Sequence, residues 1–206
     1  MCGITGVINF DGSSVSPVFL KLMTDAIKHR GPDGEGQWID KNIGLGHRRL
    51  AIIDLSSAGH QPMITPDKRF VQSYNGEIYN FREIRAELES EGVFFRSKTD
   101  SEVVLNAIAK WGKRALLKFN GMFALAIFDR KENKILLARD RYGVKPIYYA
   151  IQENKFFFGS EQKAITAHPD FKRKLNKKAL LEYFTFQNIF TDQTLLEEIK
   201  LLPSGH

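Results

Sequence analysis

The only cysteine of the chain is Cys2, directly behind the initiator methionine. Removal of Met1 would give Cys2 a free α-amino group with an ordinary pKa of about 7.7–8.0, close to that of a thiol at about 8.5. Such an amine can take the thiol proton, directly or through water, so one residue would supply both nucleophile and base. The alternative is that a lone cysteine simply packs as a small apolar side chain.

A cysteine nucleophile needs donors that stabilise an oxyanion, and the stretch YNGEIYN contains two candidates. Asn75 has a side-chain N–H and Gly76 has a backbone N–H, and one such donor typically contributes about 10²–10³ in rate. Asn-Gly is also the commonest hairpin turn signal. We expect a tight turn here, after a strand over RFVQS, and leave open whether its N–H groups serve catalysis.

Two charged residues could bind the ends of an amino acid. In HRRLAIID, Arg49 stands at the start of the apolar part of an expected strand, and its planar guanidinium suits a carboxylate. An intramolecular ion pair is the alternative, and Arg48 points to the opposite face. Thr99 and Glu102 fit a helix capping box, which leaves the Asp100 carboxylate free to face an ammonium group, unless Asp100 is itself the cap.

The histidines do not suggest a metal site. His29 and His47 have no second thiol and no ligand spacing near them. We therefore interpret both as structural and expect no metal. His29 and His47 would be the first candidates for an internal base if the terminal amine did not serve.

The residues above are spaced among short strand-like runs and a few helices. Hairpin-like connections, such as FDRKENKIL, favour antiparallel sheets covered by helices, an α+β arrangement. The expected strands are ITGVINF, IGLGHRRLAIID, RFVQSYN, GMFALAIFD, KILLARD, PIYYAI and KFFFGS. The expected helices run from Ser16-Pro17 to about His29, from Asn80 to Gly92, from Asp100 to Trp111 and from Lys177 to Phe184.

Composition limits the classes of function. A chain of 206 residues with 43% hydrophobic residues suits one domain, and its longest apolar run, Met122 to Phe128, is far below the roughly 20 residues of a membrane helix. The net charge of +6 is concentrated between Lys163 and Lys178, where Phe171 is the only aromatic residue. We expect a solvated or domain-docking face there, with no nucleic-acid or membrane partner. A single thiol and no signal peptide indicate the cytoplasm.

Taken in order, the motifs resemble the glutamine amidotransferase domain of glutamine-hydrolysing asparagine synthetases. They are MCGITG, HRGPDG, HRRLAIID, YNGEIYN, SKTDSEVV, GMFALAIFD, ARDRYGVKPIYY and GSEQKAI, and they cover residues 1–206 almost end to end. The resemblance implies the N-terminal nucleophile hydrolase fold, an αββα sandwich of two antiparallel sheets between helical layers. It also implies that Cys2 is the nucleophile with its own amine as base, and that Asn75 and Gly76 form the oxyanion hole.

The resemblance further implies a glutamine pocket. Arg49 would bind the α-carboxylate, Glu77 and Asp100 would face the α-ammonium, and main-chain groups of Ile52 and Ile53 would complete the pocket. Glutamine would be hydrolysed to glutamate and ammonia, and the ammonia would pass to a C-terminal synthetase domain of the same chain that activates aspartate with ATP and Mg²⁺. No Ser-Gly-Gly phosphate loop occurs in these residues, and LLPSGH lacks a helix stop signal, so we expect a domain cut from a longer protein, with no cofactor of its own.

Three alternatives remain at this point. A relative of the same layout could amidate another acceptor, such as a cell-surface polysaccharide precursor. A stand-alone cysteine amidase, such as a bile-salt or penicillin amidase, would share Cys2 but would not need the Arg49 and Asp100 pair. A vestigial domain used as a scaffold usually loses the thiol, which is present here. A homodimer is a further partner arrangement compatible with this sequence.

Overall fold

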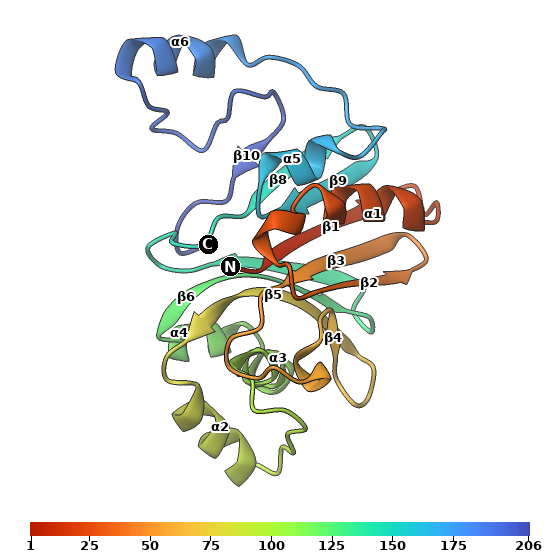
Figure 1. Cartoon of the computed structure of the whole chain (residues 1–206), viewed down its shortest axis with the longest axis vertical. Coiled ribbons are helices and arrows are strands. Elements are labelled where there is room, and N and C mark those ends of the chain that lie inside the picture. Colours follow the sequence, from red (N-terminus) through yellow and green to blue (C-terminus); the bar gives the residue numbers. More distant parts are fainter.

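The computed structural model describes all 206 residues and contains two antiparallel sheets packed face to face between helices (Figure 1). The first sheet has the strand order β10-β8-β9-β1-β3-β2, and the second has the order β4-β5-β6-β7. The strands are β1 (Gly3–Asn9), β2 (Gly34–Asp40), β3 (Ile43–Arg49), β4 (Met63–Ile64), β5 (Phe70–Ile78), β6 (Gly121–Asp129), β7 (Lys134–Arg139), β8 (Tyr148–Gln152), β9 (Lys155–Gly159) and β10 (Lys200–Leu201). The helices are α1 (Pro17–Asp25), α2 (Phe81–Ser90), α3 (Asp100–Trp111), α4 (Ala115–Lys118), α5 (Gln162–Thr166) and α6 (Lys177–Phe186).

Three apolar layers hold the sandwich together. Because side chains alternate along a strand, Ile4 of β1 packs between the two sheets whereas Val7 packs outward beneath α1 and α5. Val71 of β5 likewise faces the first sheet, while Tyr74 packs outward with α2 and α3. The layers therefore run helix, sheet, sheet, helix, which confirms the predicted αββα sandwich.

Glycines allow α1 to lie close to β3. A Cβ atom on Gly44 would come within 2.9 Å of Val15, and one on Gly46 would come within 2.4 Å of Thr24. Ser16 caps α1 and Pro17 takes its first position, as predicted. The helix ends at Asp25, earlier than the predicted end near His29, and a separate 3₁₀ turn follows.

The two helices over the second sheet begin in different ways. The hydroxyl of Thr99 accepts the Glu102 N–H at 3.2 Å, so Thr99 caps α3 as predicted and Asp100 is not the cap. The Glu102 carboxylate reaches back to the N–H groups of Arg96 and Ser97 instead of closing a capping box on Thr99. Asn80 precedes α2 but does not cap it.

Asn80 instead joins the start of α2 to the chain that leads into β6. Its amide donates to the Lys118 carbonyl and accepts the Asn120 N–H. The predicted cap was therefore correct in position and wrong in its hydrogen bond.

The prediction of a turn at Asn75-Gly76 is wrong. Both residues lie within β5, where Gly76 pairs with Phe123 of β6. A Cβ atom on Gly76 would lie 2.6 Å from the Met122 carbonyl oxygen. The glycine therefore serves the close approach of two strands and not a reversal of the chain.

The expected strand IGLGHRRLAIID is present only in its first part, because β3 ends at Arg49 and the predicted continuation through LAIID is wrong. Gly3 of β1 pairs with Arg48, and Gly34 of β2 pairs with Arg49. Neither neighbouring strand extends further, so the apolar run after Arg49 has no strand to pair with. It forms a loop in which Ile52 is 69% exposed.

Other elements depart less from expectation. The strand β2 was missed because GEGQWID lacks an alternating apolar pattern, and α6 extends two residues beyond the predicted Phe184. The predicted hairpin between β6 and β7 is present, as is a strand-to-helix junction at GSEQKAI. None of the helices is long and apolar enough to span a bilayer.

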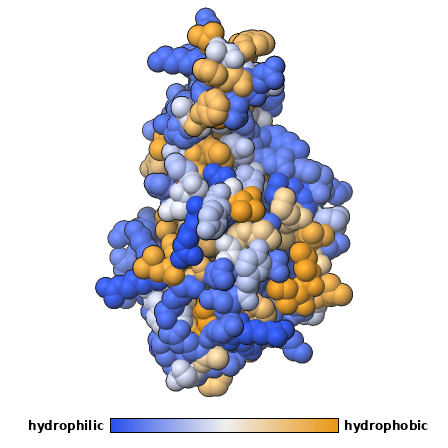
Figure 2. Space-filling model, turned by 90° about the vertical axis from the view of Figure 1, so that its left-hand side faces the viewer, coloured by the Kyte–Doolittle hydropathy of each residue, from blue (hydrophilic) through white to orange (hydrophobic).

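The region around α6 projects from one end of the sandwich (Figure 1). It carries exposed Leu181, Phe184 and Phe190, and apolar groups appear among polar ones at this end in Figure 2. Lysines of the preceding basic stretch pair with surface glutamates, for example Lys174 with Glu197 at 2.7 Å. The basic stretch is therefore largely a solvated face.

Candidate active site

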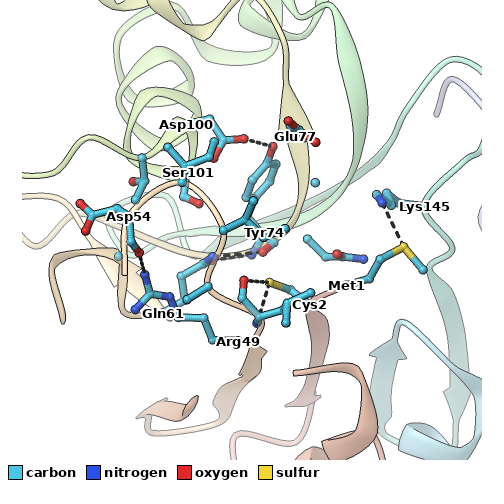
Figure 3. Close-up of a pocket in the computed structure, with 18 of the residues that line it drawn as sticks. Met1, Cys2, Arg49, Asp54, Gln61, Tyr74, Glu77, Asp100, Ser101 and Lys145 are labelled. Atoms are coloured by element: carbon cyan, nitrogen blue, oxygen red, sulfur yellow. Dashed lines mark hydrogen bonds between the residues drawn. The ribbon is translucent and has the colours of Figure 1, made fainter. Parts of the chain in front are cut away.

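A cavity of about 190 Å³ opens at the end of the sandwich where β1 begins and β3 ends (Figure 3). Chain segments far apart in sequence meet there: the N-terminus, the loop after β3, the middle of β5 and the start of α3. All eight residues predicted for the site line this cavity, namely Cys2, Arg49, Ile52, Ile53, Asn75, Gly76, Glu77 and Asp100.

Cys2 is held by the backbone of Leu50 and by the side chain of Arg30. Its Sγ accepts the Leu50 N–H at 3.3 Å and donates to the Leu50 carbonyl oxygen at 3.6 Å. The Arg30 Nε donates to the carbonyl oxygen of Cys2 at 3.0 Å. Burial raises the pKa of the thiol, whereas the Leu50 N–H, the N-terminal charge and Arg49 lower it. The thiol is thus fixed in the cavity and needs a base to ionise it at neutral pH.

Along the edge of β5 that faces the cavity, side chains accept the backbone N–H groups on either side of Gly76. The Tyr74 N–H donates to the Gln61 Oε1 at 2.7 Å, and the Ile78 N–H donates to the Asp100 Oδ2 at 3.1 Å. Alternate N–H groups of an antiparallel strand point to the same side. The Gly76 N–H lies between these two and therefore points away from β6, into the cavity that Gly76 lines.

The Asn75 amide has an unused donor. Asn75 is 2% exposed, and its Nδ2 has no hydrogen-bond partner in the protein. Ser73, on the same face of β5, contacts Gly46 and His47 of the first sheet, so Asn75 also points from the second sheet toward the first. A buried unpaired donor is rare and costly, which marks this group for a ligand.

Arg49 is oriented by carbonyl oxygens of the loop that follows it. Its guanidinium donates to Ser56 O at 2.8 Å and to Asp54 O, and it forms no ion pair with a carboxylate. The alternative of an intramolecular ion pair is therefore wrong for Arg49. It holds for Arg48, whose guanidinium pairs with Asp25 and Glu35.

Asp100 presents a buried carboxylate at the start of α3. It is 5% exposed, and its Oδ2 accepts the Tyr74 O–H at 2.8 Å as well as the Ile78 N–H. Burial raises the pKa of this carboxyl, against the hydrogen bonds from Tyr74 and Ile78 that lower it. Arg49 and Asp100 thus give the cavity one cationic and one anionic group.

Four further residues of the cavity were not predicted from the sequence: Leu50, Gln61, Tyr74 and Lys145. Leu50 acts through its backbone, which no side-chain pattern reveals. Gln61 lies in a loop without periodicity, and Tyr74 resembles an ordinary core aromatic. Lys145 stands in ARDRYGVKPIYY, a motif without evident chemistry of its own.

The two histidines considered as internal bases do not line the cavity. His29 pairs with Glu161 at 2.8 Å on the surface. His47 is fully buried, and burial lowers its pKa to about 3. No group of three or more His, Cys, Asp or Glu side chains is placed to hold a metal ion.

The model of the glutamine amidotransferase domain matches residues 1–206. The chain belongs to this family. In sequence it is similar to asparagine synthetase (glutamine-hydrolysing) 3 of Bacillus subtilis, with 41% identity over 187 residues, 89% of this chain and 30% of the relative. It is also similar to putative asparagine synthetase (glutamine-hydrolysing) 2 of Methanocaldococcus jannaschii, with 44% identity over 204 residues, 89% of this chain and 39% of the relative. The chain thus spans 30% and 39% of the length of these two curated relatives.

Solved structures give the same fold. Glutamine phosphoribosylpyrophosphate amidotransferase from B. subtilis aligns with a TM-score of 0.70 and 19% identity, over 85% of this chain and 45% of that one. The allosteric regulatory enzyme of purine biosynthesis aligns with a TM-score of 0.68 and 20% identity, over 81% and 43%. At these identities the likeness concerns the fold, which is the N-terminal nucleophile hydrolase sandwich. This amidotransferase domain therefore combines that fold with sequence similarity to glutamine-hydrolysing asparagine synthetases.

Proposed function

We propose that this domain hydrolyses the side-chain amide of L-glutamine to glutamate and ammonia, with Cys2 as an N-terminal nucleophile. The observation that carries the proposal is the cavity itself, which Cys2, Asn75 and Gly76 line together. The Asn75 Nδ2 has no partner in the protein, and the Gly76 N–H points into the cavity. Both suit the oxygen of a tetrahedral intermediate.

The reaction has two halves. In the first, the α-amine of Cys2 takes the thiol proton and the thiolate attacks the amide carbon. Asn75 and Gly76 hold the oxyanion, the C–N bond breaks, and the leaving nitrogen takes the proton from the amine to become ammonia. In the second, the amine takes a proton from water and the resulting hydroxide attacks the γ-glutamyl thioester. Glutamate leaves, and the thiol regains its proton.

The charged groups of the cavity select a free amino acid. The Arg49 guanidinium suits the α-carboxylate of glutamine, and the Asp100 carboxylate, with Glu77, suits its α-ammonium. Ile52 and Ile53 also line the cavity, where their main-chain groups would complete the glutamine pocket.

In the full-length protein, the ammonia would serve the ATP-dependent synthesis of asparagine from aspartate. The support is the naming of the relatives as glutamine-hydrolysing asparagine synthetases and their greater length. The partner would be a C-terminal synthetase domain of the same chain that binds ATP and Mg²⁺, while this domain uses no cofactor. A reactive thiol of this kind suits the reducing cytoplasm.

The test compares three preparations that differ only at the N-terminus. They are the mature protein, a protein with an uncleaved N-terminal tag, and the tagged protein after cleavage to a bare Cys2, each verified by mass spectrometry. Ammonia release from glutamine should appear only where Cys2 is terminal, because a peptide bond removes the basicity of its amine. Full turnover by the uncleaved form would contradict this mechanism, and no turnover by any form would contradict the function.

A further inference from the structure

Lys145 is a buried cation without an opposite charge. With Met1 in place it is 5% exposed and lines the same cavity as Cys2, yet its ammonium forms no ion pair with any carboxylate. Its one polar contact is the Met1 Sδ, at 3.0 Å from its Nζ. Burial of an unpaired charge is costly, so such a group in a reactive cavity calls for a chemical reason.

The loop that carries Lys145 is held firmly. The Asp140 carboxylate accepts the N–H groups of Val144 and Lys145, both at 2.9 Å. From the other side, the Arg139 guanidinium donates to the carbonyl oxygens of Gly143 and Lys145. The backbone at Lys145 is thus fixed by hydrogen bonds from two directions, which fixes the origin of its side chain.

The position of Lys145 matters because of what Met1 leaves behind. Met1 and Cys2 lie on the same side of the cavity, and the Lys145 ammonium faces the Met1 side chain (Figure 3). Removal of Met1 takes away the one contact partner of Lys145. It also turns the backbone nitrogen of Cys2 into a free α-amino group. Two nitrogen bases that both bind protons then share one end of the cavity.

The other charged groups that face this end come from several elements. They are Arg30 from the 3₁₀ turn, Arg49 from β3, Glu77 from β5, Asp100 from α3 and Asp140 from the loop after β7. Burial, with Arg30, lowers the pKa of Lys145, whereas Glu77, Asp140 and Cys2 raise it.

We propose that the Lys145 ammonium keeps the α-amino group of Cys2 in its neutral, basic form at neutral pH, through repulsion of the protonated amine. The inference rests on the proposed function, in which this amine is the base. A nearby like charge disfavours the charged form of a group, and a general base is most effective when it titrates near the operating pH. Lys145 thus acts through the amine, as a residue that tunes the base and does not contact the substrate.

The first experiment measures kcat/KM for glutamine against pH in the mature protein and its Lys145→Met and Lys145→Arg variants. In Lys145→Met, the acid limb of the kcat/KM profile should move to higher pH by at least about half a unit. At a given pH on that limb, kcat/KM should fall by about threefold. Lys145→Arg should keep the limb near its original position, because it keeps the charge. Lys134→Met, at a lysine side chain that is 77% exposed, serves as the control.

A second measurement does not depend on turnover. Cys2 labelled with ¹³C is followed by NMR across the same pH range, with the Cα shift reporting the amine and the Cβ shift reporting the thiol. The amine titration should move upward in Lys145→Met and not in Lys145→Arg. An unchanged amine titration in Lys145→Met, or equal shifts in both variants, would overturn the proposal. A mature protein that releases no ammonia would instead contradict the proposed function, while the NMR titration would still decide the role of Lys145.

Discussion

The side-chain amide of Asn75 donates no hydrogen bond within the fold. Its Nδ2 is buried and has no partner in the folded protein. Removal of this donor therefore breaks no hydrogen bond of the fold. A residue whose amide only supported a turn would have its donors used within the turn.

We expect Asn75→Ala to lower kcat by about 10²–10³ with a smaller change in KM, because the oxyanion exists only on the reaction path. Steady-state kinetics and a urea unfolding curve on the same sample measure both effects. A loss of stability with normal turnover per folded molecule would mean that the amide is structural.

The second prediction at this scale concerns Arg49 and Asp100. Glutamine analogues that lack the α-carboxylate or the α-amine should be rejected strongly, since each leaves a charged group of the cavity without its partner. Ammonia release from each analogue gives the ratio of kcat/KM values. Equal turnover of glutamine and both analogues would show that Arg49 and Asp100 do not select a free amino acid, and would favour a generic amidase.

Among the elements, β5 depends on side chains to complete its open edge. The strand β4 pairs only with Val71 and Gln72, so the next backbone groups have no strand beside them. The Gln61 amide takes this place by bonding both the N–H and the carbonyl oxygen of Tyr74. This contact holds the strand in position just before Asn75 and Gly76.

Gln61→Ala should therefore destabilise the protein by about 1–3 kcal/mol for each Tyr74 backbone group left unpaired in the interior. Chemical unfolding measures the loss. Gln152 is a matched control, because its amide makes the same two bonds to the backbone of Lys172, but on the surface. Gln152→Ala should cost far less, since water can replace its amide, and equal costs would contradict the argument.

At the scale of the whole molecule, the two sheets meet through a mostly apolar layer with one buried polar link. The Ser73 hydroxyl of β5 donates to Gly46 O and therefore accepts the Nδ1–H of His47 of β3, at 3.1 Å. The His47 Nε2 is left buried without a partner. Protonation of this nitrogen would place an unpaired charge between the sheets.

This arrangement predicts a loss of stability in mild acid. The pKa of His47 is lowered to about 3 in the folded protein from an ordinary value of 6.5. Between these values the unfolded chain binds the proton and the folded protein does not, so stability falls as pH decreases through this window. The slope is about 1.4 kcal/mol per pH unit, or about 2–3 kcal/mol from pH 6.5 to pH 4.5.

Urea unfolding at several pH values measures this slope. His47→Gln should flatten it, whatever the overall stability of the variant. His29→Gln should leave it unchanged, because that side chain is 53% exposed. An equal slope in wild type and His47→Gln would show that other groups cause the acid sensitivity.

Much of the fold and the site follows from local sequence. Capping by Ser16 and Thr99 and the spacing of apolar residues locate α1 and α3, because these signals act within one or two turns of a helix. The hairpin-like connections indicate antiparallel sheets covered by helices, and the family resemblance implies that there are two. The chemistry of an N-terminal thiol requires only Cys2 itself, and the family motifs select eight of the residues that line the cavity.

What only the tertiary structure decided concerns backbone groups and strand ends. Asn75-Gly76 is a sequence typical of turns. However, β5 pairs with β6 along its whole length and therefore continues as a strand through both residues. The run after Arg49 is apolar enough for a strand, yet β1 and β2 stop beside it, and a strand cannot form without a neighbour. The contacts of Leu50, Gln61 and Lys145 with the site were equally hidden from the sequence. Each depends on which distant segment supplies the missing hydrogen-bond partner or charge, and only the packing of the two sheets determines that.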